Sequence, residues 1–330
     1  MYLTLSRGKP SPLVLKIAGC TLLTGALTAC HPLTYGIVCD YENNTYNAAA
    51  SVEAYSEAKW TCDEDGQIRT LRGNGIPDHL VGVFPNEHNP HTITKQEIVT
   101  HVTLEPEVTK VVKPIGGADG ALGYALNSVK IDPGTTGSCS DSDQGCGHDD
   151  GNWNIETIGQ TSFNFGIDEN NGHVQPDGAY HYHGLPHGFI AKIRDSKIEP
   201  QKTDMTLFGW AADGHAIYAE YGSIIESSNI VPLKKMKSSY RLVEEISESR
   251  PSIDIYPLGT FKEDWEYVRG LGDLDECNGD KGATPEFSQM IYHYVATETY
   301  PYSPRCVKGY LDFPVDKQPP SANIEPSLHK

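Results

Sequence analysis

Hydrophobic residues in this chain form short groups separated by turn-forming residues, with one longer apolar run near the start. That run extends from residue 17 to residue 29. After it, the 32 glycines and 22 prolines, with many Asn and Asp, interrupt the chain roughly every ten residues, which is typical of short strands joined by turns. We therefore predict a mainly β fold with a minor α contribution. It would be a single disulfide-supported domain of short strands, long turns and a few short helices.

Two stretches near the N-terminus give the clearest strand signals. Residues 63–66 read Asp-Glu-Asp-Gly, which predicts a hairpin turn between a strand ending at Cys62 and another through Ile68 and Leu71. Residues 98–104 are rich enough in β-branched side chains to form a further strand. This part of the chain is therefore expected to be β.

Helical signals are scarce. Thr260 followed by Glu263 resembles a capping box, which would open a short helix through Trp265 and Val268. The polar, proline-bearing tail from residue 316 is expected to be disordered.

The first 29 residues have the order of an export signal. Three basic residues and no acidic residue precede the apolar run, whose 13 residues fall short of the roughly 20 needed to span a bilayer. The run ends in Leu27-Thr-Ala-Cys30, which resembles the lipobox of bacterial lipoproteins. We expect a lipid-anchored protein of the cell envelope whose membrane partner is reached through Cys30. His31 is not the aspartate that retains lipoproteins in the inner membrane, which favours the outer membrane. Ordinary secretory cleavage is the alternative, but Leu27 suits it poorly.

Cysteine usage agrees with export. Once Cys20 is lost with the signal and Cys30 carries lipid, six cysteines remain. An even number in an oxidising compartment predicts disulfides, and no pair has the two-residue gap typical of zinc ribbons. Fifteen connectivities are open for six cysteines. Pairing of sequence neighbours would give three local loops: Cys39 with Cys62, Cys139 with Cys146, and Cys277 with Cys306.

The chain is strongly acidic. It carries 26 basic and 44 acidic residues, and loss of the signal leaves 23 basic residues and a net charge of −21. Such a surface repels phosphate backbones, so we exclude nucleic acid as a primary partner. Metal ions and cationic ligands would be attracted, although acidity also serves solubility alone.

Candidate chemistry is concentrated in residues 173–187, which contain four histidines. If the Tyr-His-Tyr-His stretch at 180–183 is extended, His181 and His183 lie on one face and both tyrosines on the other. Two imidazoles in this arrangement suit a zinc or copper ion, and a third ligand from elsewhere would leave an open position. The alternative is a buried hydrogen-bonded cluster without metal. Two acidic stretches, 168–172 and 273–276, offer oxygen ligands for calcium, but neither fits an EF-hand loop, so plain turns are favoured.

The chain also resembles the YHYH-domain family of bacterial proteins, named for the tetrapeptide at 180–183. The resemblance rests on that segment and on motifs at 74–79 (NGIPDH), 84–90, 123–134, 173–176 (HVQP), 209–218, 270–279 and 284–287. It covers residues 73 to about 309, which implies one domain. We therefore expect a signal peptide at 1–29, a lipidated N-terminus with strands at 30–72, the YHYH domain at 73–309 and a polar tail at 310–330.

The resemblance narrows the choice of ligands without assigning an activity. It places four histidines on positions of the family pattern, and these rank first as metal ligands: His79, His173, His181 and His183. His187 and His215 rank lower, since the family often has other residues there and phenylalanine is expected at 215. Three carboxylates lie within matching motifs and would either orient a ligating imidazole or, for at least two of them, cap turns: Asp78, Asp177 and Asp213.

Three functions remain open from the sequence. The first is an exported metal-binding lipoprotein of unassigned activity. The second is an extracytoplasmic zinc or copper enzyme, in which a metal-bound water or a redox step does the chemistry. The third is a cell-surface module that binds a glycan or protein through exposed aromatic residues such as Trp153, Trp210 and Tyr218. No small-molecule, glycan or protein partner can be named from these patterns.

Overall fold

The structure is a computed structural model that describes residues 38–65, 67–116, 120–143, 145–148, 151–197, 204–223, 225–226, 229–230, 233–311 and 327–328. The expected signal peptide, the expected lipid attachment at Cys30 and most of the polar tail lie outside these residues. Residues 31–330 form one compact unit. Strands account for 34% of the structure and helices for 6%, so the prediction of a mainly β fold is confirmed.

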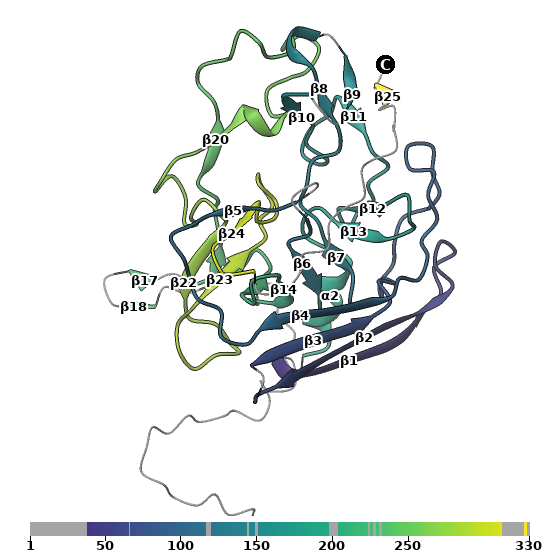
Figure 1. The fold of residues 1–330 in the computed structure, drawn as a ribbon, viewed down its shortest axis with the longest axis vertical. Helices are drawn as coiled ribbons and strands as arrows, with labels where there is room; N and C mark the ends of the chain where they lie inside the picture. Colours follow the sequence, from purple (N-terminus) through teal and green to yellow (C-terminus); the bar gives the residue numbers. More distant parts are fainter. Residues whose placement is uncertain are drawn as a thin grey trace, which may run out of the picture. The chain divides into compact units, whose positions relative to one another are not determined.

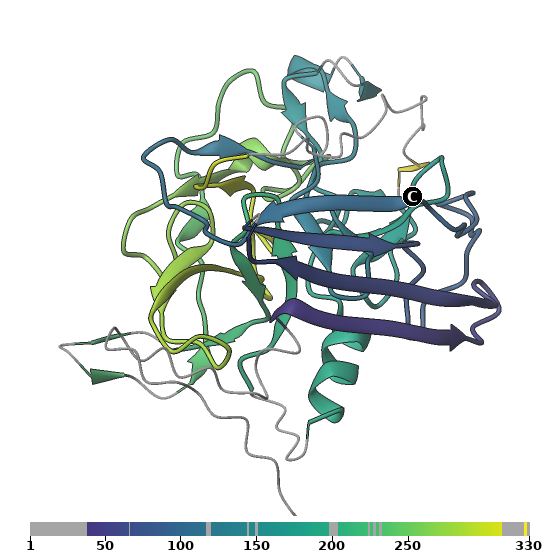
Figure 2. The same cartoon turned by 60° about the horizontal axis from the view of Figure 1, so that its bottom comes forward.

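The first sheet is an antiparallel meander in the order β1-β2-β3-β4 (Figure 1). Figure 2 shows its four strands side by side. On β2, Ser56, Ala58 and Trp60 are buried while the residues between them are exposed, because successive side chains of a strand point to opposite faces. The predicted hairpin is confirmed by the antiparallel pairing of β2 and β3, in which Asp63 is opposite Ile68, and the strand near 98–104 is confirmed as well. The strand bounds are β1 (Asp40–Asn47), β2 (Ala54–Asp63), β3 (Ile68–Gly73) and β4 (Ile98–Thr103).

A mixed eight-stranded sheet has the order β12-β13-β7-β6-β14-β15-β23-β22. Several of its strands have only buried residues, as in a sheet that is covered on both faces. Any polar side chain on these strands is therefore inside the protein and needs a partner. The bounds are β6 (Gly123–Ala125), β7 (Lys130–Ile131), β12 (Gly172–Val174), β13 (Tyr180–Tyr182), β14 (Leu207–Ala211), β15 (Ala216–Tyr218), β22 (Gly279–Gly282) and β23 (Ile291–Val295).

The two sheets pack against each other through one continuous core, and polar contacts fix their approach. The Trp60 indole on β2 donates to the carbonyl of Leu126, at the end of β6 (3.1 Å). The Ser128 hydroxyl donates to the carbonyl of Glu57 (2.9 Å) and accepts from the amide of Gly75 (3.1 Å). These bonds join β2 to the turn between β6 and β7, so the first sheet has a fixed register over the second.

The remaining elements are short. α2 (His187–Asp195) follows β13 and buries Phe189, Ile190 and Ile193. Two single-turn 3-10 helices span Asp141–Asp143 and Lys262–Asp264. The small strands are β8 (Ser138–Cys139), β9 (Cys146–His148) and β10 (Trp153–Asn154), and the pairs β11 (Phe163–Asn164) with β25 (Ser327–Leu328), β16 (Tyr221–Gly222) with β19 (Lys234–Lys235), β17 (Ile225–Glu226) with β18 (Asn229–Ile230), β20 (Tyr240–Leu242) with β21 (Trp265–Tyr267), and β24 (Cys306–Val307) with β5 (Lys113–Pro114).

The helix predicted from Thr260 and Glu263 is wrong. The chain makes one 3-10 turn and then pairs as β21 with β20. Asp264, and not Glu263, accepts from the backbone amides at the turn, while the Thr260 hydroxyl donates to the carbonyl of Pro257. Glu263 instead accepts from the backbone and side chain of Asn154.

All three local disulfides predicted from sequence proximity are present. Cys39 joins Cys62 at the edge of the first sheet, and Cys139 joins Cys146 across β8 and β9. Cys277 joins Cys306 and ties the segment before β22 to β24.

Candidate metal centre

Three of the predicted ligands meet on one face of the β12–β13 hairpin. His173 and His181 are directly opposite each other in the antiparallel register. His183 lies two residues beyond His181, and alternation brings it to the same face. One donor atom from each of the three side chains lies within 4.8 Å of the others, and all three residues are buried. We call these three residues the histidine cluster.

The proton on each ring is located by its hydrogen bond to the backbone. Nδ1 of His173 is 2.9 Å from the carbonyl oxygen of Phe165, and Nδ1 of His183 is 3.2 Å from that of Gly134. Nδ1 of His181 is 3.4 Å from the carbonyl of Ala179. A carbonyl oxygen only accepts, so each Nδ1 carries the proton and each Nε2 of a neutral ring presents a lone pair.

These lone pairs point at one another. Nε2 of His183 is 2.9 Å from Nε2 of His181 and 3.1 Å from Nε2 of His173. Two acceptors at such distances do not form a hydrogen bond. His181 has the longest contact at Nδ1, but a proton moved to its Nε2 would still leave the contact between His173 and His183 without a hydrogen. The three Nε2 atoms could therefore hold a metal ion between them.

The distances suit one metal ion. Imidazole nitrogens about 2.0–2.1 Å from a tetrahedral zinc lie roughly 3.3 Å apart, close to the separations in the cluster. Burial keeps the ligands neutral, as metal binding requires. Desolvation lowers the pKa of His173 to about 4 and holds the pKa of His181 and His183 well below the ordinary histidine value. All three rings are thus uncharged at neutral pH, with one proton on each ring.

The carbonyls that hold the rings are part of a wider network. The carbonyl of Gly134 also accepts from the Thr157 hydroxyl (2.9 Å), which fixes its position beside His183. Lys130 lies in register with His181 on the neighbouring strand β7, and its ammonium donates to the Gln175 side chain (2.6 Å). The carbonyls of Phe165, Gly134 and Ala179 could not be singled out from the sequence, because a backbone carbonyl leaves no signal in residue type.

His79 is not part of the cluster. Its Nδ1 donates to the carbonyl of Leu80 (2.8 Å), so its Nε2 accepts from the Tyr182 hydroxyl at 2.6 Å. Tyr182 projects from the face of β13 opposite to His181, as the alternation predicted. The ranking of His79 among the first four ligands is therefore corrected, since it belongs to a buried polar network behind the strand.

The lower-ranked residues are also placed apart from the cluster. Asp78 accepts from Asn127 and pairs with Lys192 of α2 (2.6 Å). Asp177 accepts from the amide of Ala179 in the hairpin turn, and Asp213 accepts from the amide of His215 in another turn. Two of the three carboxylates thus cap turns as expected, and none of the three contacts a cluster imidazole. His187 is exposed at the start of α2.

The two acidic stretches considered for calcium form turns. Asp168 accepts from the amides of Asn170, Gly172 and Gly82, and from the Tyr180 hydroxyl. Asp275 accepts from the amides of Cys277 and Gly279. Their oxygens are engaged by the protein, so plain turns are the better description.

The aromatic residues suggested for a binding module are core residues. Trp153 is 8% exposed, Trp210 2% and Tyr218 is fully buried. Stacking of a glycan on an open ring face has no support from these three side chains.

In the ranges that the structure describes, no helix is long and apolar enough to cross a membrane.

Taken together, the fold and the site define a mainly β, disulfide-linked protein with a buried three-histidine cluster. Residues 99–309, well over half of the chain, match the family model described as YHYH protein, and the chain belongs to this family. The family resemblance is thereby confirmed, and the Tyr-His-Tyr-His segment supplies two of the three imidazoles. Comparison with curated proteins and with solved structures finds no match.

Proposed function

We propose that this protein is an exported, lipid-anchored metal-binding protein of the cell envelope, which holds a zinc or copper ion through the histidine cluster. One observation carries the metal assignment: the Nε2 atoms of His173, His181 and His183 converge, while the Nδ1 atom of each ring faces a backbone carbonyl. Imidazole is a ligand that both zinc and copper accept readily. The lipobox-like residues 27–30 and the three disulfides support export and anchoring at Cys30.

The test is metal content. We expect untagged protein purified from the membrane fraction to carry close to one zinc or copper ion per chain by mass spectrometry. The double variant His181→Ala/His183→Ala should be folded and metal-free. His187→Ala is the matched control, because it removes an exposed histidine of the same segment and should retain the metal. A wild-type protein that stays empty after both metals are offered would refute the proposal.

Catalysis is the second candidate, and it rests on the ligand count. In the described residues, the group that could hold a metal consists of three histidines. Three protein ligands with a fourth position for water is the arrangement of catalytic zinc sites, whereas structural sites use four protein ligands. X-ray absorption on the loaded protein distinguishes the two: a bound water or exchangeable anion favours catalysis, and a fourth protein ligand favours storage or structure.

The lipid anchor has its own test. Cys30→Ser should move the protein from the membrane fraction to the soluble fraction without changing its metal content, because the histidine cluster that would hold the metal is left intact. A wild-type protein that is already in the soluble fraction would refute the lipid anchor.

A further inference from the structure

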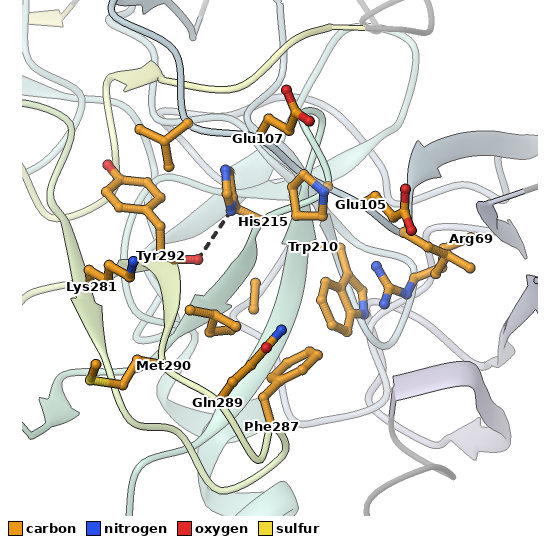
Figure 3. A pocket seen from close by; sticks show the side chains of 16 residues that line it. Arg69, Glu105, Glu107, Trp210, His215, Lys281, Phe287, Gln289, Met290 and Tyr292 are labelled. Atoms are coloured by element: carbon orange, nitrogen blue, oxygen red, sulfur yellow. Dashed lines mark hydrogen bonds between the residues drawn. The ribbon is translucent and has the colours of Figure 1, made fainter. Parts of the chain in front are cut away.

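A second site lies at the other end of the eight-stranded sheet. A cavity of about 610 Å³ lies between the two sheets. It is lined by Arg69 of β3, by Trp210 and Tyr292 of β14 and β23, and by Phe287 and Met290 from the loop between β22 and β23 (Figure 3). A cavity of this size holds a drug-sized molecule. In the order of the sheet, β7 and β6 separate β14 from the hairpin that carries the histidine cluster.

Arg69 is a buried cation with an incomplete set of partners. The residue is 3% exposed, and its Nε donates to the carbonyl of Val38 (3.0 Å). Its guanidinium carbon lies 3.4 Å from the centre of the Trp210 ring, an attractive cation–π contact. Within the described ranges, no carboxylate lies at ion-pair distance from it, and its two Nη groups have no hydrogen-bond acceptor.

A buried charge without a counter-charge is costly, since cations removed from water are normally paired. Burial lowers the pKa of Arg69 to about 9, which still leaves the group positive at neutral pH. Figure 3 shows the guanidinium beside Trp210 at the cavity, which Glu105 and Glu107 also line. Both glutamates are exposed, and among the described residues neither forms an ion pair with Arg69.

Apart from the exposed side chains of Glu105, Glu107, Lys281 and Gln289, the rest of the lining is mostly apolar. Phe287 meets the edge of Trp210 with ring centres 6.4 Å apart, and Met290 and Ile291 add apolar surface. His215 donates through Nδ1 to the carbonyl of Tyr292 (3.1 Å), so its Nε2 is a buried lone pair, and no donor reaches it from the part of the chain described here. The cavity thus combines a cation, an acceptor and aromatic walls.

We propose that this cavity binds a small organic carboxylate with an apolar body. The carboxylate would accept from the planar guanidinium of Arg69, which suits two-point recognition. The apolar body would lie against Phe287, Tyr292 and Met290. The site is independent of the histidine cluster and of any metal.

The test compares an acid with its neutral analogue on metal-free, full-length mature protein. By titration calorimetry at neutral pH, we expect naphthalene-2-carboxylate to bind one to one and at least tenfold more tightly than 2-naphthalenemethanol. Arg69→Gln should remove that difference. Arg72→Gln should preserve it, because this arginine lies on the same strand but is exposed to solvent. Equal affinity for acid and alcohol, no binding of the acid, or an unchanged Arg69→Gln variant would each refute the proposal.

A measurement on the wild type guards against misfolding of the variant. With methionine methyl groups labelled for NMR, the acid should shift the signal of Met290. Met205 and Met236 are buried elsewhere and serve as internal controls. Shifts at those two, with none at Met290, would place the ligand outside this cavity and refute the assignment.

Discussion

His173 and His181 face each other across the β12–β13 hairpin, with ring centres 4.7 Å apart. Directly opposed residues of an antiparallel pair share a face, so a ligand pair is built into the strand register. His183 then completes the cluster from the next position on that face.

A first prediction is that metal stabilises the fold. A metal ion that binds only the native state adds about 2.7 kcal/mol to the free energy of unfolding when the free metal concentration is one hundred times the dissociation constant. We therefore expect zinc to raise the unfolding temperature of chelator-treated wild-type protein. The His181→Ala/His183→Ala variant should not respond, and His187→Ala should respond like the wild type. Equal responses in all three proteins would indicate binding elsewhere on the acidic surface.

The second prediction concerns the opposite face of β13. The Tyr182 hydroxyl donates to Nε2 of His79 and lies 3.1 Å from the Asn127 amide. Tyr182→Phe leaves the buried His79 nitrogen without its donor, which should cost about 1–3 kcal/mol of unfolding free energy. Metal content should stay at the wild-type level.

Denaturant titration checks this value, and Tyr46→Phe is the control because Tyr46 is 50% exposed. Loss of metal in Tyr182→Phe would show that the two faces of the strand act together.

Much of the site was open to prediction from the sequence. The alternation at 180–183 correctly placed His181 and His183 together. The Pro-Asp-Gly turn at 176–178 also predicts a hairpin, which would have singled out His173 as the third ligand. His79 was ranked too high because membership of a family motif does not distinguish a ligand from a buried hydrogen-bonding residue.

Other features depend on contacts between distant segments. Arg69 and Trp210 belong to different sheets, and nothing in the local pattern brings them together. The expected helix after Thr260 failed for a similar reason. Asp264 is held by Arg250, and the following residues pair with β20, so tertiary contacts override a local capping signal.

The third prediction is that burial of His293 makes the free energy of unfolding depend on pH. This side chain is buried, and desolvation lowers its pKa to about 4. The centre of its ring lies 5.1 Å from the centre of the Tyr218 ring, and the nearby His215 also lowers its pKa. Asp280 is directly opposite His293 in the pairing of β22 with β23. Between about pH 6.5 and 4 the unfolded chain binds a proton that the folded chain does not, so stability falls with acidification.

One such group contributes at most about 1.4 kcal/mol per pH unit in that window. Chemical denaturation of metal-free protein at several pH values should therefore show a shallower slope for His293→Gln than for the wild type. His187→Gln, which removes an exposed histidine, is the control. Identical slopes for His293→Gln and the wild type would mean that His293 does not carry this dependence.

The fourth prediction concerns the ion pair of Arg250 and Asp264. Nε and Nη2 of Arg250 lie 2.6 and 2.8 Å from the carboxylate, which also accepts from the amides of Gly259 and Phe261. Both side chains are almost completely buried. Asp264→Asn removes the counter-charge and leaves the guanidinium buried without it, which should cost about 3–5 kcal/mol. Denaturant titration of the disulfide-intact protein measures the loss. Glu244→Gln breaks a solvent-exposed pair with Arg241 and should cost less than about 1 kcal/mol. A comparable loss in both variants would mean that the buried pair contributes no more to stability than the exposed pair does.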